Sequence, residues 1–357
     1  MDLIASRENR LGHIVLNRPQ ALNTLTLPMV RSFRRALDAF GEDDGVCAVL
    51  VTGAGDRGLC AGGDVRILYE LERTQKRLFA DFWREEYELN ARIASFPKPY
   101  VALMDGIVMG GGVGISAHGD RRVVTERSRI AMPEVGIGFF PDVGASWLLS
   151  RAGAVGLYMA LSGVSVTAAD AIDAGLADLM IPSQDIERLI GDLQAIDVAE
   201  DVDVALRRLA RQPDDGQLSK HRRLLAEATA HEKVADAIAA LTREGSEFSL
   251  RAAADIGSRS PTALKVTRAL LGRAMRAPDL ETCLTNEFKA ACGMLETHDL
   301  YEGIRAAIID KDRRPKWSPD RLEVVSDESI ENILAGDGTP PPAFKSWNSS
   351  PYSRWEN

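Results

Sequence analysis

The stretch "YVALMDGIVMGGGVGIS", residues 100–116, decides the fold class of this chain. Its first five residues are apolar without interruption, as in a β-strand that is covered on both faces. Three consecutive glycines, residues 110–112, then open a predicted helix, and without β-carbons they let a ligand approach the backbone closely. Unpaired N–H groups at a helix start suit a developing oxyanion. Tight packing of the helix on the strand explains the same glycines equally well.

Short apolar runs elsewhere in the first half predict more strands, at residues 13–16, 47–52 and 121–124. The segments between them predict helices over about 28–40 and 74–95. Alternating strands and helices indicate an α/β fold with mostly parallel strands. From about residue 183 the strand signals stop, and helical patterns cover 184–196, 220–241, 246–257, 261–275, 280–296 and 299–309.

This pattern divides the chain into three predicted parts. Residues 1–200 form the α/β core, and residues 201–325 form a helical region that packs over it. Residues 326–357 are rich in Pro, Ser and Gly towards their end, which predicts an extended tail.

Composition excludes several classes of function. The chain has 357 residues, 45% of them hydrophobic, with a net charge of −9, which disfavours a nucleic-acid partner held by a basic surface. Its four cysteines lack C-x-x-C spacing and an accompanying His cluster, so neither a metal site nor a disulfide framework is expected. No stretch approaches the roughly 18 apolar residues of a membrane span, and no signal-peptide pattern opens the chain. We therefore expect a cytoplasmic protein with no membrane partner.

A second glycine segment raises a competing interpretation. In "VLVTGAGDRG", Gly53, Gly55 and Gly58 match G-x-G-x-x-G, the pattern of dinucleotide-binding loops. That function needs a helix starting in the loop and a second strand that ends in an acid about 20 residues later. The chain instead continues as "LCAGGDVRILYE" into the long helix, so a nucleotide site is disfavoured.

Two acids stand in apolar surroundings in "AMPEVGIGFFPDVGAS", residues 131–146. Glu134 and Asp142 have no Lys or Arg between them, and burying an unpaired carboxylate costs several kcal/mol or shifts its pKa. Glu86 is a third anomalous acid, because the helical period places it in the apolar stripe of the 74–95 helix, whereas Glu85 points about 100° away. A pair with an interior Arg or a backbone N–H remains an alternative explanation for Glu86. The acids predict a site that uses carboxylate chemistry.

Four motifs, "NRPQALNTL" (17–25), "GLCAGGDV" (58–65), "DGIVMGGGVGIS" and "AMPEVGIGFFPDVGAS", together resemble the crotonase, or enoyl-CoA hydratase/isomerase, superfamily. The resemblance implies a crotonase-like spiral of ββα units with a C-terminal helical region. Within that superfamily the chain is most similar to the 3-hydroxyisobutyryl-CoA hydrolases, through "FWREEYELN" (82–90), "FFPDVG" (139–144) and "HDLYEGIRAAIIDKDRRPKWSP" (298–319).

The resemblance implies a role for each site residue. The backbone N–H groups of Gly63 and Gly111 would form the oxyanion hole. Glu134 would act as general base or nucleophile, Asp142 would orient the 3-hydroxyl group or the water, and Glu86 would hold the polar network from the opposite side. The remaining substrate contacts would come from one loop, made of Ala61, Gly62, Asp64 and Val65. His118 and Cys60 are more simply explained as structural, and the basic residues of 309–317 suit CoA phosphates or solvent about equally.

One departure from the family pattern favours hydrolysis. Hydratases of this superfamily carry a second glutamate at the position that is Gly114 here. We therefore expect hydrolysis of a short-chain 3-hydroxyacyl-CoA, such as 3-hydroxyisobutyryl-CoA in valine catabolism, with no cofactor beyond the CoA of the substrate. A hydratase or isomerase that works with Glu134 alone, and a non-catalytic acyl-CoA-binding protein, are the alternatives. Since relatives often form trimers, a homo-oligomer is the assembly to consider.

Overall fold

A computed structural model describes residues 1–71, 76–345 and 347. Six strands form the main sheet in the order β1-β2-β3-β4-β6-β8, with β1 and β2 antiparallel and the other pairs parallel. Strands β5 and β7 form a small parallel sheet beside it. The strands are β1 (Leu3–Glu8), β2 (Leu11–Leu16), β3 (Ala48–Gly53), β4 (Tyr100–Met104), β5 (Ile107–Met109), β6 (Arg121–Val124), β7 (Arg129–Ala131) and β8 (Leu179–Met180). This is the predicted α/β fold.

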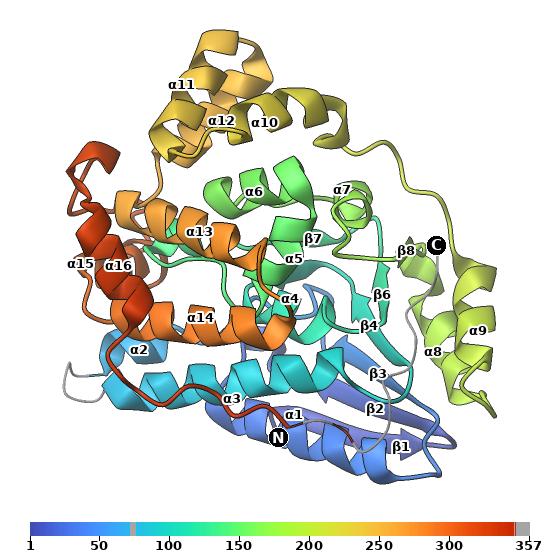
Figure 1. The fold of residues 1–357 in the computed structure, drawn as a ribbon. Helices are drawn as coiled ribbons and strands as arrows, with labels where there is room; N and C mark the ends of the chain where they lie inside the picture. Colours follow the sequence, from blue (N-terminus) through green and yellow to red (C-terminus); the bar gives the residue numbers. More distant parts are fainter. Residues whose placement is uncertain (72–75, 346, 348–357) are drawn as a thin grey trace.

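Helices cover both faces of the main sheet (Figure 1). Those of the first half are α1 (Leu27–Glu42), α2 (Arg66–Glu70), α3 (Lys76–Ala94), α4 (Gly111–Ser116), α5 (Ala145–Arg151), α6 (Gly153–Ser162) and α7 (Ala168–Asp173). Those of the second half are α8 (Ile186–Gln194), α9 (Asp201–Leu209), α10 (Arg222–Thr229), α11 (Val234–Glu244), α12 (Glu247–Gly257), α13 (Pro261–Ala274), α14 (Leu280–Met294), α15 (His298–Ile304) and α16 (Asp327–Ala335). No described helix is both long and apolar enough to cross a membrane.

The apolar run that suggested the fold is buried on both sides of the sheet. In β4, Tyr100, Ala102 and Met104 belong to the large core cluster, whereas Val101 and Leu103 belong to a second cluster under α8 and α9. Alternate residues of a strand point to opposite faces, so a strand between two helical layers has to be apolar throughout. The prediction of a doubly covered strand is confirmed.

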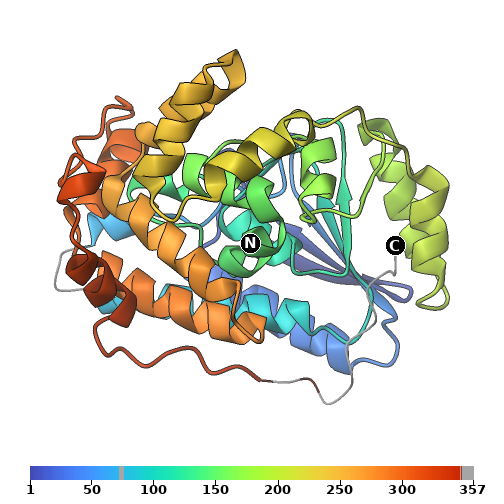
Figure 2. The ribbon, with the colours of Figure 1, turned by 45° about the horizontal axis from the view of Figure 1, so that its top comes forward.

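From α10 onward the helical half lies on the side of the sheet that carries α3, whereas α8 and α9 cover the other face. Helix α14 packs on α3, and α13 packs on α5 (Figure 2). Helix α13 begins at a Ser260 side chain that accepts from the Ala263 N–H, with Pro261 in its first turn, as a capped helix should. Through α14, the second half of the chain therefore reaches the helix on which Glu86 was predicted.

Several predicted boundaries need correction. The single helix expected over 220–241 is two, α10 and α11, separated by a turn at residues 230–233. The helix expected over 299–309 ends at Ile304 and continues as a π-helical turn, Arg305–Ile309. Strand β1 was missed because its burial is mostly one-sided and weak, which leaves little apolar alternation to recognise. Residues 74 and 75 of the expected helix 74–95 lie outside the described residues.

The tail expected to be extended over 326–357 contains a helix. Ser326 caps α16 by accepting from the Ser329 N–H, and Ile330, Ile333 and Leu334 bury their side chains. The helix packs on α14, and the sequence carries two signals for it that the predicted tail did not take into account, the apolar spacing and the serine cap. After α16 the chain is extended to Lys345, and the Trp347 indole N–H donates to the Arg92 carbonyl on α3 at 3.0 Å. Residues 346 and 348–357 lie outside the described residues.

Candidate active site

Two glycine loops meet where strand β5 is followed by α4. The Cys60 N–H donates to the Ile107 carbonyl at 3.2 Å, and the Met109 N–H donates to the Cys60 carbonyl at 2.9 Å. These bonds bring Gly63 beside Gly111, since a β-carbon on Gly111 would lie 3.4 Å from the Gly63 nitrogen. Gly111 is the first residue of α4, where the backbone N–H has no partner within its own helix. The predicted oxyanion residues are therefore neighbours, as the proposed role requires.

Three buried carboxylates converge on these loops. Glu86, Glu134 and Asp142 have exposed fractions of 2%, 8% and 6%. A β-carbon on Gly110 would lie 2.7 Å from Glu134 Oε1, and one on Gly111 would lie 2.5 Å from Glu86 Oε1. Both glycines are thus needed to let the carboxylates approach the backbone.

The three acids have no cationic partner within the described part of the chain. One oxygen each of Glu86 and Glu134 is buried there without a hydrogen-bond partner, which is costly for an ionised group. Burial, followed by the charge of Asp142, raises the pKa values of Glu86 and Glu134 well above their usual range. Burial also raises the pKa of Asp142 to about 7. At neutral pH the group therefore retains at least one proton.

Asp142 has one close partner that the sequence did not suggest. The Tyr87 hydroxyl donates to Asp142 Oδ2 at 2.7 Å, and both side chains are buried. A donor on the ionised form opposes the effect of burial on the Asp142 pKa. Tyr87 follows Glu86 on α3, where it was concealed among other apolar residues of the buried face.

A cavity of about 760 Å³ contains all the predicted site residues. Its lining includes Ala61, Gly62, Gly63, Asp64, Val65, Glu86, Gly111, Glu134 and Asp142. Asp64 differs from the other three acids of the cavity because its carboxylate pairs with Arg18, from which it accepts at 3.2 Å. Aromatic rings of Phe79, Phe82, Trp83 and Phe139 also line the cavity, and Trp83 stacks on Phe139 with ring centres 5.2 Å apart. A concave, mostly apolar space with few convergent polar groups is the usual form of a small-molecule site.

The Gly114 position has no room for a side chain. A β-carbon there would lie 2.7 Å from Val143 Cβ and 2.9 Å from Asn90 Nδ2. The first of these atoms is attached directly to the backbone and cannot rotate away. A glutamate cannot be accommodated at this position without moving the turn that carries Asp142.

Two residues judged structural occupy structural positions. His118 is buried, with Nε2 2.7 Å from the Val143 carbonyl, and does not line the cavity. Cys60 is buried between the loops, and burial raises the pKa of its thiol to about 12, so it is a poor nucleophile. Of the basic residues in 309–317, Arg313 lines the cavity, together with Pro315 and Trp317.

Glu287 is a buried acid that sequence reasoning missed. It accepts from the Gly144 and Ser146 N–H groups at 2.7 and 3.0 Å, just after Asp142. The sequence does carry a signal for Glu287, of the same kind as the one for Glu86. Glu287 lies in an apolar stripe of α14 with Cys283, Leu284 and Phe288. Burial raises its pKa to about 8, against the effect of these hydrogen bonds.

The fold and the cavity together define an enzyme of the crotonase class. The family model "Enoyl-CoA hydratase/isomerase" matches residues 11–334. The chain is 38% identical to the mitochondrial 3-hydroxyisobutyryl-CoA hydrolase of Rattus norvegicus and 36% identical to that of Homo sapiens, each covering 95% of this chain and about 90% of the relative. The chain belongs to the enoyl-CoA hydratase/isomerase family.

Solved structures give the same assignment of fold. A carnitinyl-CoA dehydratase from Mycobacterium thermoresistibile is 44% identical, with a TM-score of 0.91 over 96% of this chain and 99% of the other. An enoyl-CoA hydratase from Rhodobacter sphaeroides is 36% identical, with a TM-score of 0.86 over 95% of this chain and 98% of the other. The crotonase-like fold expected from the resemblance is confirmed.

Proposed function

We propose that the chain hydrolyses the thioester of a short 3-hydroxyacyl-CoA, with 3-hydroxyisobutyryl-CoA as the preferred acyl group. The main observation that supports this proposal is that Glu86, Glu134 and Asp142 line one cavity together with two glycine loops. The similarity to proteins named 3-hydroxyisobutyryl-CoA hydrolase supports a thioester hydrolase as the enzyme class.

The N–H groups of Gly63 and Gly111 would bind the thioester oxygen and stabilise the negative charge that develops on it. Removing one such donor typically costs about 3–4 kcal/mol of transition-state stabilisation. Because the N–H groups belong to two loops joined by backbone hydrogen bonds, they need little reorganisation during the reaction.

Glu134 would activate the attack on the thioester carbon, either by taking a proton from water or by attacking as a nucleophile. By either route the carbon–sulfur bond breaks, water supplies the new oxygen, and the CoA sulfur leaves with a proton. Asp142 would accept a hydrogen bond from the 3-hydroxyl group of the substrate. Glu86, across the glycines from Glu134, would complete the polar wall.

The same cavity contains groups suited to the CoA portion. Arg66, Arg259 and Arg313 line it, and guanidinium groups suit phosphates. No cofactor or metal besides the CoA of the substrate is part of this proposal. The proposal also includes three expectations: a cytoplasmic location, a place in valine breakdown and assembly of several copies. The rat and human relatives are named as mitochondrial.

A second candidate is hydration or dehydration of an acyl-CoA, favoured by one observation. The structure titled carnitinyl-CoA dehydratase is 44% identical over almost the whole chain. Against this function stands Gly114, whose surroundings exclude a second catalytic carboxylate at that position.

The deciding experiment compares two assays on the purified protein. Thiol release from 3-hydroxyisobutyryl-CoA supports the proposal, whereas hydration of crotonyl-CoA without thiol release contradicts it. Glu134→Gln should lower kcat for thiol release by about 10²–10⁴-fold while acyl-CoA still binds, because the variant keeps its shape and loses its basicity. Near-wild-type turnover in this variant would exclude Glu134 from the reaction.

A further inference from the structure

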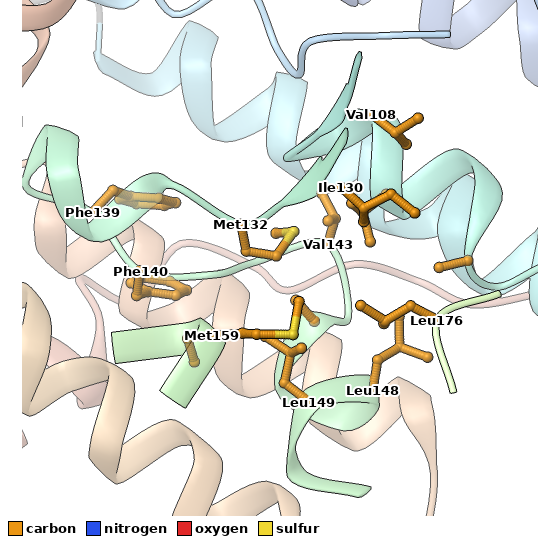
Figure 3. Close-up of a cluster of buried hydrophobic side chains, with 14 of the residues drawn as sticks. Val108, Ile130, Met132, Phe139, Phe140, Val143, Leu148, Leu149, Met159 and Leu176 are labelled. Atoms are coloured by element: carbon orange, nitrogen blue, oxygen red, sulfur yellow. The ribbon is translucent and has the colours of Figure 1, made fainter. Parts of the chain in front are cut away.

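The turn that carries Asp142 is strained. Val143 has φ of 54°, in the left-handed region that β-branched residues rarely adopt, and Gly144 follows with φ of 80°. Such a conformation persists only when its surroundings hold it, and strained residues concentrate at functional sites. The Val143 side chain is buried in a hydrophobic cluster with Ile130 and Met132 (Figure 3). The turn is therefore held by more than its own sequence.

Three buried polar side chains hold this turn, two of them from helices and the third from the segment after α4. His118 follows α4, and its Nε2 donates to the Val143 carbonyl at 2.7 Å, because that oxygen can only accept. Glu287 on α14 accepts from the Gly144 N–H at 2.7 Å, and Tyr87 on α3 donates to Asp142 itself at 2.7 Å. Each of the three consecutive residues 142–144 thus has a hydrogen-bond partner from a different part of the chain.

None of the three side chains lines the cavity, so any effect on a substrate would act through the turn. We propose that Tyr87, His118 and Glu287 are positioning residues that keep the Asp142 carboxylate aimed into the cavity. The inference rests on the proposed function, in which Asp142 contacts the substrate.

The hydrogen bond from Tyr87 also affects the charge on Asp142. The titratable groups that face Asp142 are Glu86 and Tyr87 from α3, Glu134 from the turn after β7, and Glu287 from α14. Each of these four groups becomes an anion when it ionises, and none of them brings a positive charge to Asp142. The ionised form of Asp142 is favoured by two hydrogen-bond donors, first the Tyr87 hydroxyl and then the backbone N–H of Asp142 itself. Removing this hydroxyl should raise the Asp142 pKa further above about 7.

The first test compares Tyr87→Phe with Tyr100→Phe. Tyr100 is equally buried, and its hydroxyl donates to the Ile115 carbonyl at 2.6 Å, away from Asp142. We expect Tyr87→Phe to lower kcat about tenfold with KM within about twofold, and to move the rising limb of the kcat pH profile to higher pH. Tyr100→Phe should lose comparable stability but leave kcat and the pH profile as in the wild type.

The second test compares Glu287→Gln with Asp170→Asn. Asp170 is also a buried carboxylate that holds a loop, accepting from the Leu218 and Gln217 N–H groups at 2.8 and 3.0 Å. Glutamine can present only one oxygen to the N–H groups of the turn, so Glu287→Gln should lower kcat by about tenfold or more. Asp170→Asn should change the unfolding midpoint alone.

Titration of the Asp142 carboxyl group, followed by ¹³C NMR without substrate and assigned with Asp142→Asn, separates the two proposals. A wild-type protein that releases no thiol contradicts the proposed function, while the titration still reports on Asp142. A higher midpoint in Tyr87→Phe than in Tyr100→Phe supports the positioning role. Equal midpoints and equal kcat values in these two variants would overturn it.

Discussion

Buried charged side chains in two regions of this molecule have opposite surroundings. On β6, Arg121 pairs with Asp203 and Arg122 pairs with Asp178, and the two arginine side chains are only 2% and 8% exposed. In the cavity, Glu86, Glu134 and Asp142 are as deeply buried without a cation among the described residues.

The difference separates acids that have a cationic partner from acids that lack one among the described residues. A buried charge that only supports the fold needs a partner, since desolvation is otherwise uncompensated. An unpaired one raises its pKa and becomes able to exchange a proton near neutral pH, which suits acid–base chemistry. Burying the unpaired acids of the cavity therefore lowers the free energy of unfolding, a loss that the ion pairs of β6 prevent in their own region.

The largest expected effect comes from breaking the paired region. Arg122→Met leaves the half-buried Asp178 beside the Arg122 backbone N–H, to which it is bonded at 2.7 Å, but without its cation. We expect a loss of about 3–5 kcal/mol in the free energy of unfolding, measured by urea denaturation. Arg122→Met combined with Asp178→Asn should recover part of it. A loss below about 1 kcal/mol would mean that the pair is not needed at this site.

An intermediate effect of the opposite sign is expected in the cavity. Because the folded state raises the Asp142 pKa to about 7, it holds a proton that the unfolded chain releases near pH 4. The free energy of unfolding therefore falls as pH rises through this window. Asp142→Asn removes this contribution and should be more stable than the wild type at pH 8, by on the order of 1–3 kcal/mol, but not at pH 4. Urea denaturation at both pH values measures the difference; an equal difference at both would contradict it.

The smallest effect is expected from Glu85, the neighbour of Glu86. Its carboxylate accepts from Arg31 at 2.8 Å in a pair whose side chains are 26% and 51% exposed. Glu85→Gln should lower the free energy of unfolding by less than about 1 kcal/mol, and this loss should become smaller with added salt. The variant should leave kcat unchanged. Glu86→Gln, one residue on, should lower kcat in the same assay. Equal kcat values for the two variants would remove the distinction between paired and unpaired acids on α3.

Part of the site could be predicted because its signals are local. Glu86 was found from the helical period of α3, and the glycine loops from consecutive glycines after strands. Glu287 carried the same kind of signal on α14, but nothing local connects that helix with a turn 143 residues earlier. Tyr87 resembled an ordinary core aromatic, since a hydroxyl pointing at Asp142 has no sequence pattern.

The α/β class, the helical second half and the three acids that lack local partners could all be predicted from the sequence. These follow from periodicity and from the cost of burying charge, which act on neighbouring residues. Three further features depend on how distant segments pack together: the acids share one cavity, Val143 and Asn90 fill the space beside Gly114, and Tyr87, His118 and Glu287 hold the Asp142 turn. Those contacts join segments far apart in the chain, and their geometry is set by how helices pack on the sheet rather than by any local preference.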